Sequence, residues 1–182
     1  MKKIQMVDLQ TQYKFIKTNV DAGIEQVLNS AQFINGPAVK SFQKNLESYL
    51  GVKNVIPCAN GTDALQIAMM GLGLKPGDEV ITADFTYAST VEVIALLGLT
   101  PVLVDVDPIT FNINPESIEK AITKKTKAIV PVHLFGQVAQ MEKIMQIAKK
   151  HGIFIIEDNA QALGANFTSV SYTHLTLPTM DS

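Results

Sequence analysis

Short apolar runs alternate with segments of helical spacing along most of the chain. Apolar, β-branched runs typical of buried strands occur at residues 54–58, 78–82, 101–106, 127–133 and 153–158. Segments whose apolar residues recur every three or four positions predict helices at 19–30, 37–50, 63–73, 88–97, 115–123 and 140–152. Strands that are apolar on both faces and separated by helices predict an α/β fold, in which helices cover both faces of a mostly parallel sheet.

The residues that follow each predicted strand are the candidates for a site, because ligands bind beyond the carboxyl ends of strands in open parallel sheets. After the first strand, Gly61 precedes a helix that begins near Thr62. The amides of Thr62 and Asp63 and the Thr62 hydroxyl could hold a phosphate there. The alternative is a purely structural turn, in which Asn60 or Thr62 caps the helix.

Polar side chains also follow later strands. Tyr87 could lie flat against a planar ligand or simply pack on the core. Asp158 ends the apolar run "IFII", where a carboxylate needs a cationic partner or serves as a helix cap. A protonated ring nitrogen of a ligand would be such a partner, and Gln161 could bind the same ligand. For His133 we expect a structural, hydrogen-bonded role.

Composition narrows the classes of function. The 182 residues are 47% hydrophobic and 18% charged, with a net charge of -2, so nothing favours binding to nucleic acid or to a membrane. All 15 basic residues are Lys, so this segment supplies no arginine clamp for a carboxylate or phosphate. A single Cys58 and a start without an apolar leader predict a cytoplasmic protein. The glycines of "GLGLKPG" (71–77) follow a helix and precede a strand, the reverse of a dinucleotide-binding motif.

Four segments together resemble one family of enzymes. "NGTDALQIAM", "PGDEVITADFTYAST", "PVLVDVDPITFNI" and "IIEDNAQALGA" occur in the order found in DegT/StrS-like sugar aminotransferases. The resemblance covers almost all of residues 4–167 and implies the aspartate aminotransferase-like fold (pyridoxal phosphate fold type I), here truncated. It also implies pyridoxal 5'-phosphate as the cofactor.

The resemblance assigns roles to individual residues. Gly61, Thr62 and Asp63 would bind the cofactor phosphate, and Tyr87 would stack on its pyridine ring. Asp158 would pair with the ring nitrogen, and Gln161 would contact the ring hydroxyl. Asn159 departs from the family motif, where Ala is commoner. The site residues that this family implies are therefore Gly61, Thr62, Asp63, Tyr87, Asp158 and Gln161, with no metal ligand.

The resemblance also implies a function. Members convert a keto group of a nucleotide-linked sugar to an amine, usually with glutamate as donor, for surface polysaccharide or other amino-sugar synthesis, and they work as homodimers. Within the family, the sequence motifs most resemble those of transaminases of 3-oxo sugars. The family's Schiff-base lysine lies in a later segment that this chain lacks, so we expect the chain itself to be inactive. A dehydratase of the same family, with His in place of that Lys, and a non-catalytic cofactor-binding regulatory protein are the alternatives.

The last residues differ from the rest of the chain. We predict that residues 1–168 form the amino-terminal part of the cofactor-binding large domain and that 169–182 are a non-native tail. "VSYTHLTLPT" (170–179) has no counterpart in the family and corresponds to a translation of adapter DNA used in sequencing libraries. We expect neither a helix nor a strand there.

Overall fold

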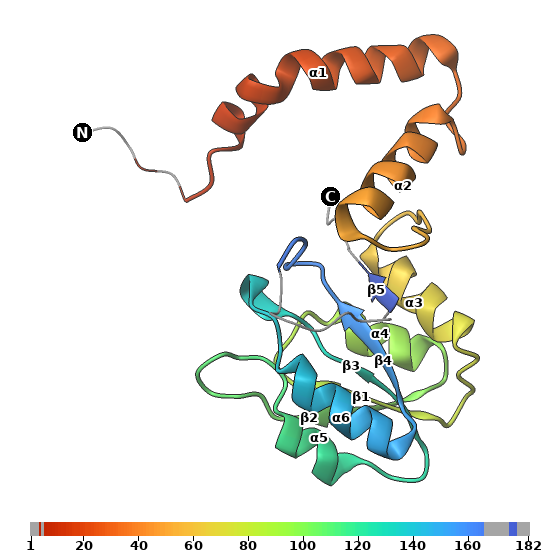
Figure 1. The fold of residues 1–182 in the computed structure, drawn as a ribbon, viewed down its shortest axis with the longest axis vertical. Helices are drawn as coiled ribbons and strands as arrows, with labels where there is room; N and C mark the ends of the chain where they lie inside the picture. Colours follow the sequence, from red (N-terminus) through yellow and green to blue (C-terminus); the bar gives the residue numbers. More distant parts are fainter. Residues whose placement is uncertain (1–3, 5, 166–174, 178–182) are drawn as a thin grey trace. The chain divides into compact units, whose positions relative to one another are not determined.

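The chain divides into two compact units, Met1–Pro57 and Cys58–Ser182 (Figure 1). The structure, a computed structural model, describes residues 4, 6–165 and 175–177. No helix in this described part is long and apolar enough to cross a membrane.

The first unit contains two helices, α1 (Leu9–Ser30) and α2 (Pro37–Leu50). Helix α1 begins well before the predicted residue 19, because the Asp8 carboxylate caps it by accepting the Thr11 N–H at 3.0 Å. The bounds of α2 are those predicted from Pro37 at its start and from Gly51, which ends it at φ +67°.

The predicted strand at 54–58 is wrong, since this segment pairs with no strand in the described part of the chain. The backbone of Val55 bonds instead to side chains of α2. Its N–H donates to Glu47 Oε1 at 3.1 Å, and its carbonyl accepts from Gln43 Nε2 at 2.9 Å. The two backbone groups that would enter a strand ladder are therefore already satisfied within the first unit.

The second unit is built on a parallel sheet in the order β2-β1-β3-β4-β5. Each pairing in it is parallel. Four of its strands confirm predictions to within a few residues: β1 (Glu79–Ala83), β2 (Thr100–Val104), β3 (Thr126–Val130) and β4 (Phe154–Asp158).

The remaining strand, β5 (Leu175–Leu177), was not expected, because the sequence pattern predicts no element there. It pairs with β4 from Ile156↔Leu175 to Asp158↔Leu177. The rest of the predicted non-native tail lies outside the described residues, and its origin stays a prediction.

Helices cover the two faces of the sheet. Residues of α3 and α4 pack on one face with Val80, and residues of α5 and α6 pack on the other with Ile81. This follows from the alternation of side chains along a strand, which sends neighbouring apolar residues to opposite faces. The helices are α3 (Gly61–Gly71), α4 (Ser89–Leu96), α5 (Pro115–Ala121) and α6 (Met141–His151).

A buried histidine ties the loop after β3 to the end of β4. His133 Nδ1 accepts the Ala139 N–H at 3.1 Å, so the ring proton is on Nε2, which donates to Glu157 Oε2 at 2.9 Å. The His133 N–H also donates to the Asp158 carbonyl at 3.1 Å. His133 thus has the structural role expected for it, and it fixes the strand end on which Asp158 sits.

Replacement of this ring should destabilise the chain. His133→Ala removes the acceptor of the buried Ala139 N–H and a donor to Glu157, and we expect it to lower the free energy of unfolding by about 2–4 kcal/mol. Urea unfolding followed by circular dichroism measures this. The control His151→Ala, at the exposed end of α6, should cost less than about 1 kcal/mol. Equal stability of the two variants would contradict the structural role of His133.

Candidate functional site

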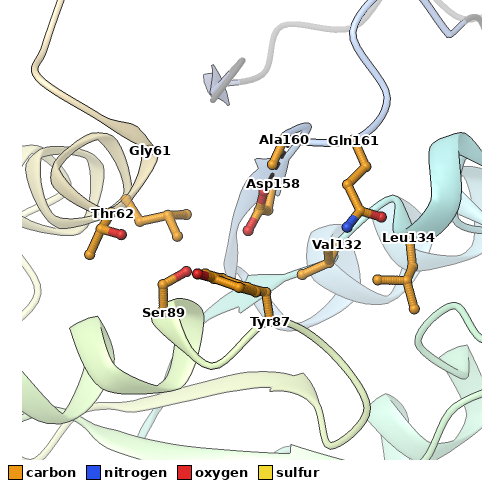
Figure 2. Close-up of a pocket in the computed structure, with 10 residues that line it drawn as sticks. Gly61, Thr62, Tyr87, Ser89, Val132, Leu134, Asp158, Ala160 and Gln161 are labelled. Atoms are coloured by element: carbon orange, nitrogen blue, oxygen red, sulfur yellow. Dashed lines mark hydrogen bonds between the residues drawn. The ribbon is translucent and has the colours of Figure 1, made fainter. Parts of the chain in front are cut away.

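A pocket lies at the carboxyl ends of β3 and β4, where the N-termini of α3 and α4 also converge (Figure 2). Five of the six predicted site residues line it, and the sixth, Asp63, does not. The lining residues are Gly61, Thr62, Leu65, Tyr87, Ser89, Val132, Leu134, Asp158, Ala160 and Gln161.

The start of α3 presents backbone donors to this pocket. Asn60 is the helix cap, and its Oδ1 accepts the Asp63 N–H at 2.9 Å. The amide of Asp63 is therefore engaged within the helix end, and Asp63 does not line the pocket. The N–H groups of Gly61 and Thr62 have no partner inside the helix, and they form its positive end. Asn60 thus has the capping role that was one of the two alternatives, and the N–H groups of Gly61 and Thr62 still offer donors for an anion.

Asp158 is the last residue of β4 and is buried, with 5% of its surface exposed. Both carboxylate oxygens have defined donors. The Ala160 N–H donates to Oδ1 at 3.1 Å, and the Thr90 hydroxyl donates to Oδ2 at 3.2 Å. The residues after Asp158 form turns, not an α-helix, so the carboxylate is not a helix cap. A buried carboxylate beside a pocket is suited to a cationic group on a ligand.

The side-chain amide of Gln161 has a fixed orientation. Its Oε1 accepts the Phe135 N–H at 2.6 Å, from a residue whose φ of +57° turns the chain after β3. This bond directs the Nε2 donor away from Phe135, and Figure 2 shows the side chain reaching toward the pocket between Val132 and Leu134. Gln161 is therefore a donor for a ligand oxygen.

Tyr87 provides an aromatic surface in the same space. It lines the pocket, and 66% of its surface is exposed, so it is not the packed core residue of the alternative interpretation. An exposed ring at a pocket wall is suited to contact with a flat ligand.

Sequence reasoning missed the remaining lining residues and the Thr90 contact. Ser89 and Thr90 belong to "ADFTYAST", which follows β1, and Val132 and Leu134 belong to the loop after β3. The rule that ligands bind beyond strand ends pointed to these segments. It did not identify which side chains turn inward, because that depends on where α4 begins and on the turn at Phe135.

The arrangement can bind a planar, anionic molecule that carries a cationic ring nitrogen and a ring oxygen. Backbone donors at the start of α3 are suited to the anionic group, and Tyr87 is suited to the flat face of the ring. Asp158 is suited to the ring nitrogen, and Gln161 is suited to the ring oxygen. None of the described pocket residues is a lysine. Within the described ranges, His, Cys, Asp and Glu side chains form no group of three or more that could hold a metal ion.

Curated relatives match most of the chain. A "UDP-2-acetamido-2-deoxy-3-oxo-D-glucuronate aminotransferase" of Pseudomonas aeruginosa is 52% identical over 90% of this chain and 46% of its own length. A "Pleiotropic regulatory protein" of Geobacillus stearothermophilus is 48% identical over 90% of this chain and 44% of its length. A UDP-N-acetyl-3-dehydro-alpha-D-glucosamine 3-aminotransferase of Acidithiobacillus ferrooxidans is 44% identical over 89% and 44%. The chain therefore spans under half the length of these relatives.

Solved structures show the same fold. Streptomyces venezuelae DesV has a TM-score of 0.87 at 36% identity, over 90% of this chain and 44% of its own. NtdA of Bacillus subtilis, solved with bound cofactor PMP, has a TM-score of 0.85 at 36% identity, over 90% and 38%. The E. coli GDP-4-keto-6-deoxy-D-mannose-3-dehydratase, with bound hydrated PLP, has a TM-score of 0.76 at 31% identity, over 82% and 40%.

The sequence pattern of one family matches residues 14–173. This range includes parts of both units and every residue that lines the pocket. The chain belongs to the DegT/DnrJ/EryC1/StrS aminotransferase family.

Proposed function

We propose that the protein of which this chain forms part is a pyridoxal phosphate-dependent aminotransferase. It would convert a keto group of a nucleotide-linked sugar to an amine, with glutamate as donor. The observation that carries the proposal is the convergence of Gly61, Thr62, Tyr87, Asp158 and Gln161 on one pocket. Each of them has the chemistry that one part of this cofactor requires.

The described residues fit the cofactor part by part. Gly61 and Thr62 would donate backbone N–H groups to the phosphate at the positive end of α3. Tyr87 would lie against the ring, and Gln161 Nε2 would donate to the ring hydroxyl. Asp158 would hold the proton on the ring nitrogen. When bound, the cofactor would supply the electron-withdrawing ring on which amino transfer depends.

We infer for Asp63 a more indirect role than the phosphate contact that the family resemblance implies. Its amide is bonded to Asn60, and its carboxylate Oδ2 accepts from Asn60 Nδ2 at 3.2 Å. We infer that Asp63 stabilises the start of α3 and contributes to phosphate binding only by fixing that helix end.

The named activities of the relatives support the substrate class. Two of the three relatives described above are transaminases or aminotransferases of UDP-linked 3-oxo sugars by name. The assignment of a nucleotide-linked sugar and an amino donor as the substrates rests on both of these relatives. A 3-oxo sugar, a role in surface polysaccharide synthesis, a cytoplasmic location and a homodimeric assembly are finer parts of the same proposal.

Two observations keep second candidates open. The dehydratase of E. coli shares the fold and binds the same cofactor, and the regulatory protein of G. stearothermophilus is nearly half identical. The described pocket would suit all three functions equally, since the residues proposed to bind the cofactor line it and none of its lining residues is a lysine.

Cofactor binding by the 182-residue chain tests the proposed site. Pyridoxamine 5'-phosphate is the suitable probe, because it has no aldehyde that would react with the 15 lysines. Asp158→Asn should weaken its binding about tenfold or more, because a charge-assisted contact to the ring nitrogen is lost. Fluorescence anisotropy of the probe measures the dissociation constants. Asp21→Asn, on α1, is the matched control and should bind as the unchanged chain does. Equal affinities for both variants would contradict the site.

Completion of the chain tests the activity. Residues 1–165 fused to the carboxyl-terminal portion of the P. aeruginosa relative should transfer an amino group from glutamate to a UDP-linked 3-oxo sugar, measured as 2-oxoglutarate released. The 182-residue chain should show no turnover, since its described pocket has no lysine amine to act as covalent anchor and base. A fusion that binds pyridoxal phosphate but releases no 2-oxoglutarate would contradict the proposed activity.

A further inference from the structure

We propose that Thr90 is a positioning residue that holds the Asp158 carboxylate in the orientation needed to pair with the ring nitrogen of the cofactor. The proposal rests on the proposed function, because it assigns a role toward the same ligand. Thr90 itself does not line the pocket.

The contact joins two buried groups from distant parts of the sequence. Thr90 is fully buried, with 0% of its surface exposed, and Asp158 is 5% exposed. The Thr90 hydroxyl lies 3.2 Å from Asp158 Oδ2, across a sequence separation of 68 residues. A hydroxyl has one proton to donate, and a carboxylate can only accept, so the direction of this hydrogen bond is fixed.

The second carboxylate oxygen is held from another element. The Ala160 N–H donates to Oδ1 at 3.1 Å from the turn after β4, whereas Thr90 is in the first turn of α4. Because a donor meets each oxygen, the carboxylate cannot rotate about its Cβ–Cγ bond without breaking both contacts. Carboxylate oxygens offer about four acceptor positions in total, so these bonds are compatible with a further partner in the pocket.

The same turn carries the aromatic wall of the site. The Thr90 N–H lies 3.4 Å from the Tyr87 carbonyl, so Tyr87 and Thr90 belong to one short segment at the start of α4. A bond from Thr90 to Asp158 therefore restrains the spacing between the backbone of Tyr87 and the carboxylate. These are the two groups that would meet the face and the nitrogen of one pyridine ring.

Valine and serine variants separate the hydroxyl from the shape of the side chain. Thr90→Val keeps the volume and the β-branch but removes the donor, so Asp158 loses the restraint on Oδ2. Thr90→Ser keeps the donor and removes only a methyl group. If Thr90 served only for packing, the two changes should weaken cofactor binding to a similar extent.

The test uses the 182-residue chain with pyridoxamine 5'-phosphate whose ring nitrogen is labelled with ¹⁵N. Thr90→Val should weaken binding about tenfold. It should also lower the pH at which the ring nitrogen of the bound probe loses its proton, read from the ¹⁵N chemical shift. Thr90→Ser should restore both values to within about twofold, and Thr18→Val on α1 is the matched control.

The outcomes distinguish this inference from the function on which it rests. If Asp158→Asn weakens binding while Thr90→Val changes neither the affinity nor the ¹⁵N titration, Thr90 does not position the carboxylate and the proposed site stands. If Thr90→Val and Thr90→Ser weaken binding equally and leave the ¹⁵N titration unchanged, the role of Thr90 is packing and the inference is wrong. If the unchanged chain does not bind the probe at millimolar concentration, the proposed site and the inference are both overturned.

Discussion

The parallel pairing of β3 with β4 is the constraint on which the site depends. Because the two strands run in the same direction, their carboxyl ends meet at one edge, and the bridge Val132↔Asp158 continues their pairing into the loops. The N–H of His133 and the carbonyl of Asp158 extend it by one more hydrogen bond. The strand backbone thereby places Asp158 at the pocket, and donors from α4 and from the next turn stabilise its buried carboxylate there.

The two faces of β4 at this edge have separate functions. Glu157 is directed to His133, and the pair fixes the loop after β3. Asp158 is directed to the opposite side and lines the pocket. Adjacent acidic residues at the end of a buried strand thus do not form one acidic cluster. Because side chains alternate along a strand, Glu157 contacts the scaffold and Asp158 faces the pocket.

The fold was predictable where hydrophobic patterning was regular. Strands that are apolar on both faces indicated the parallel sheet, and Pro37 and Gly51 marked both ends of α2. The segment around Val55 is equally apolar, but it is not a strand, because side chains of α2 form hydrogen bonds with its backbone. The local sequence pattern does not reveal this contact. Asp158, Gln161 and Tyr87 could be selected from the sequence because each lies at the end of a strand or in the segment after it, and all three line the pocket. Thr90 could not be selected in this way, because its partner Asp158 is distant in sequence. The hydrogen bond of the Asp63 amide could not be predicted either, because it depends on the rotamer of Asn60.

We propose that strand and helix ends in this chain converge to bind one planar, phosphorylated cofactor. A titration of the ¹⁵N-labelled chain with pyridoxamine 5'-phosphate, followed by ¹H–¹⁵N spectra, would detect this binding residue by residue. We expect saturable shifts in the amides of Gly61 and Thr62 and in the side-chain Nε2 of Gln161. We expect little change in the Asp63 amide, which is bonded to Asn60. Shifts confined to surface lysines, or no shift at the start of α3, would contradict the proposal.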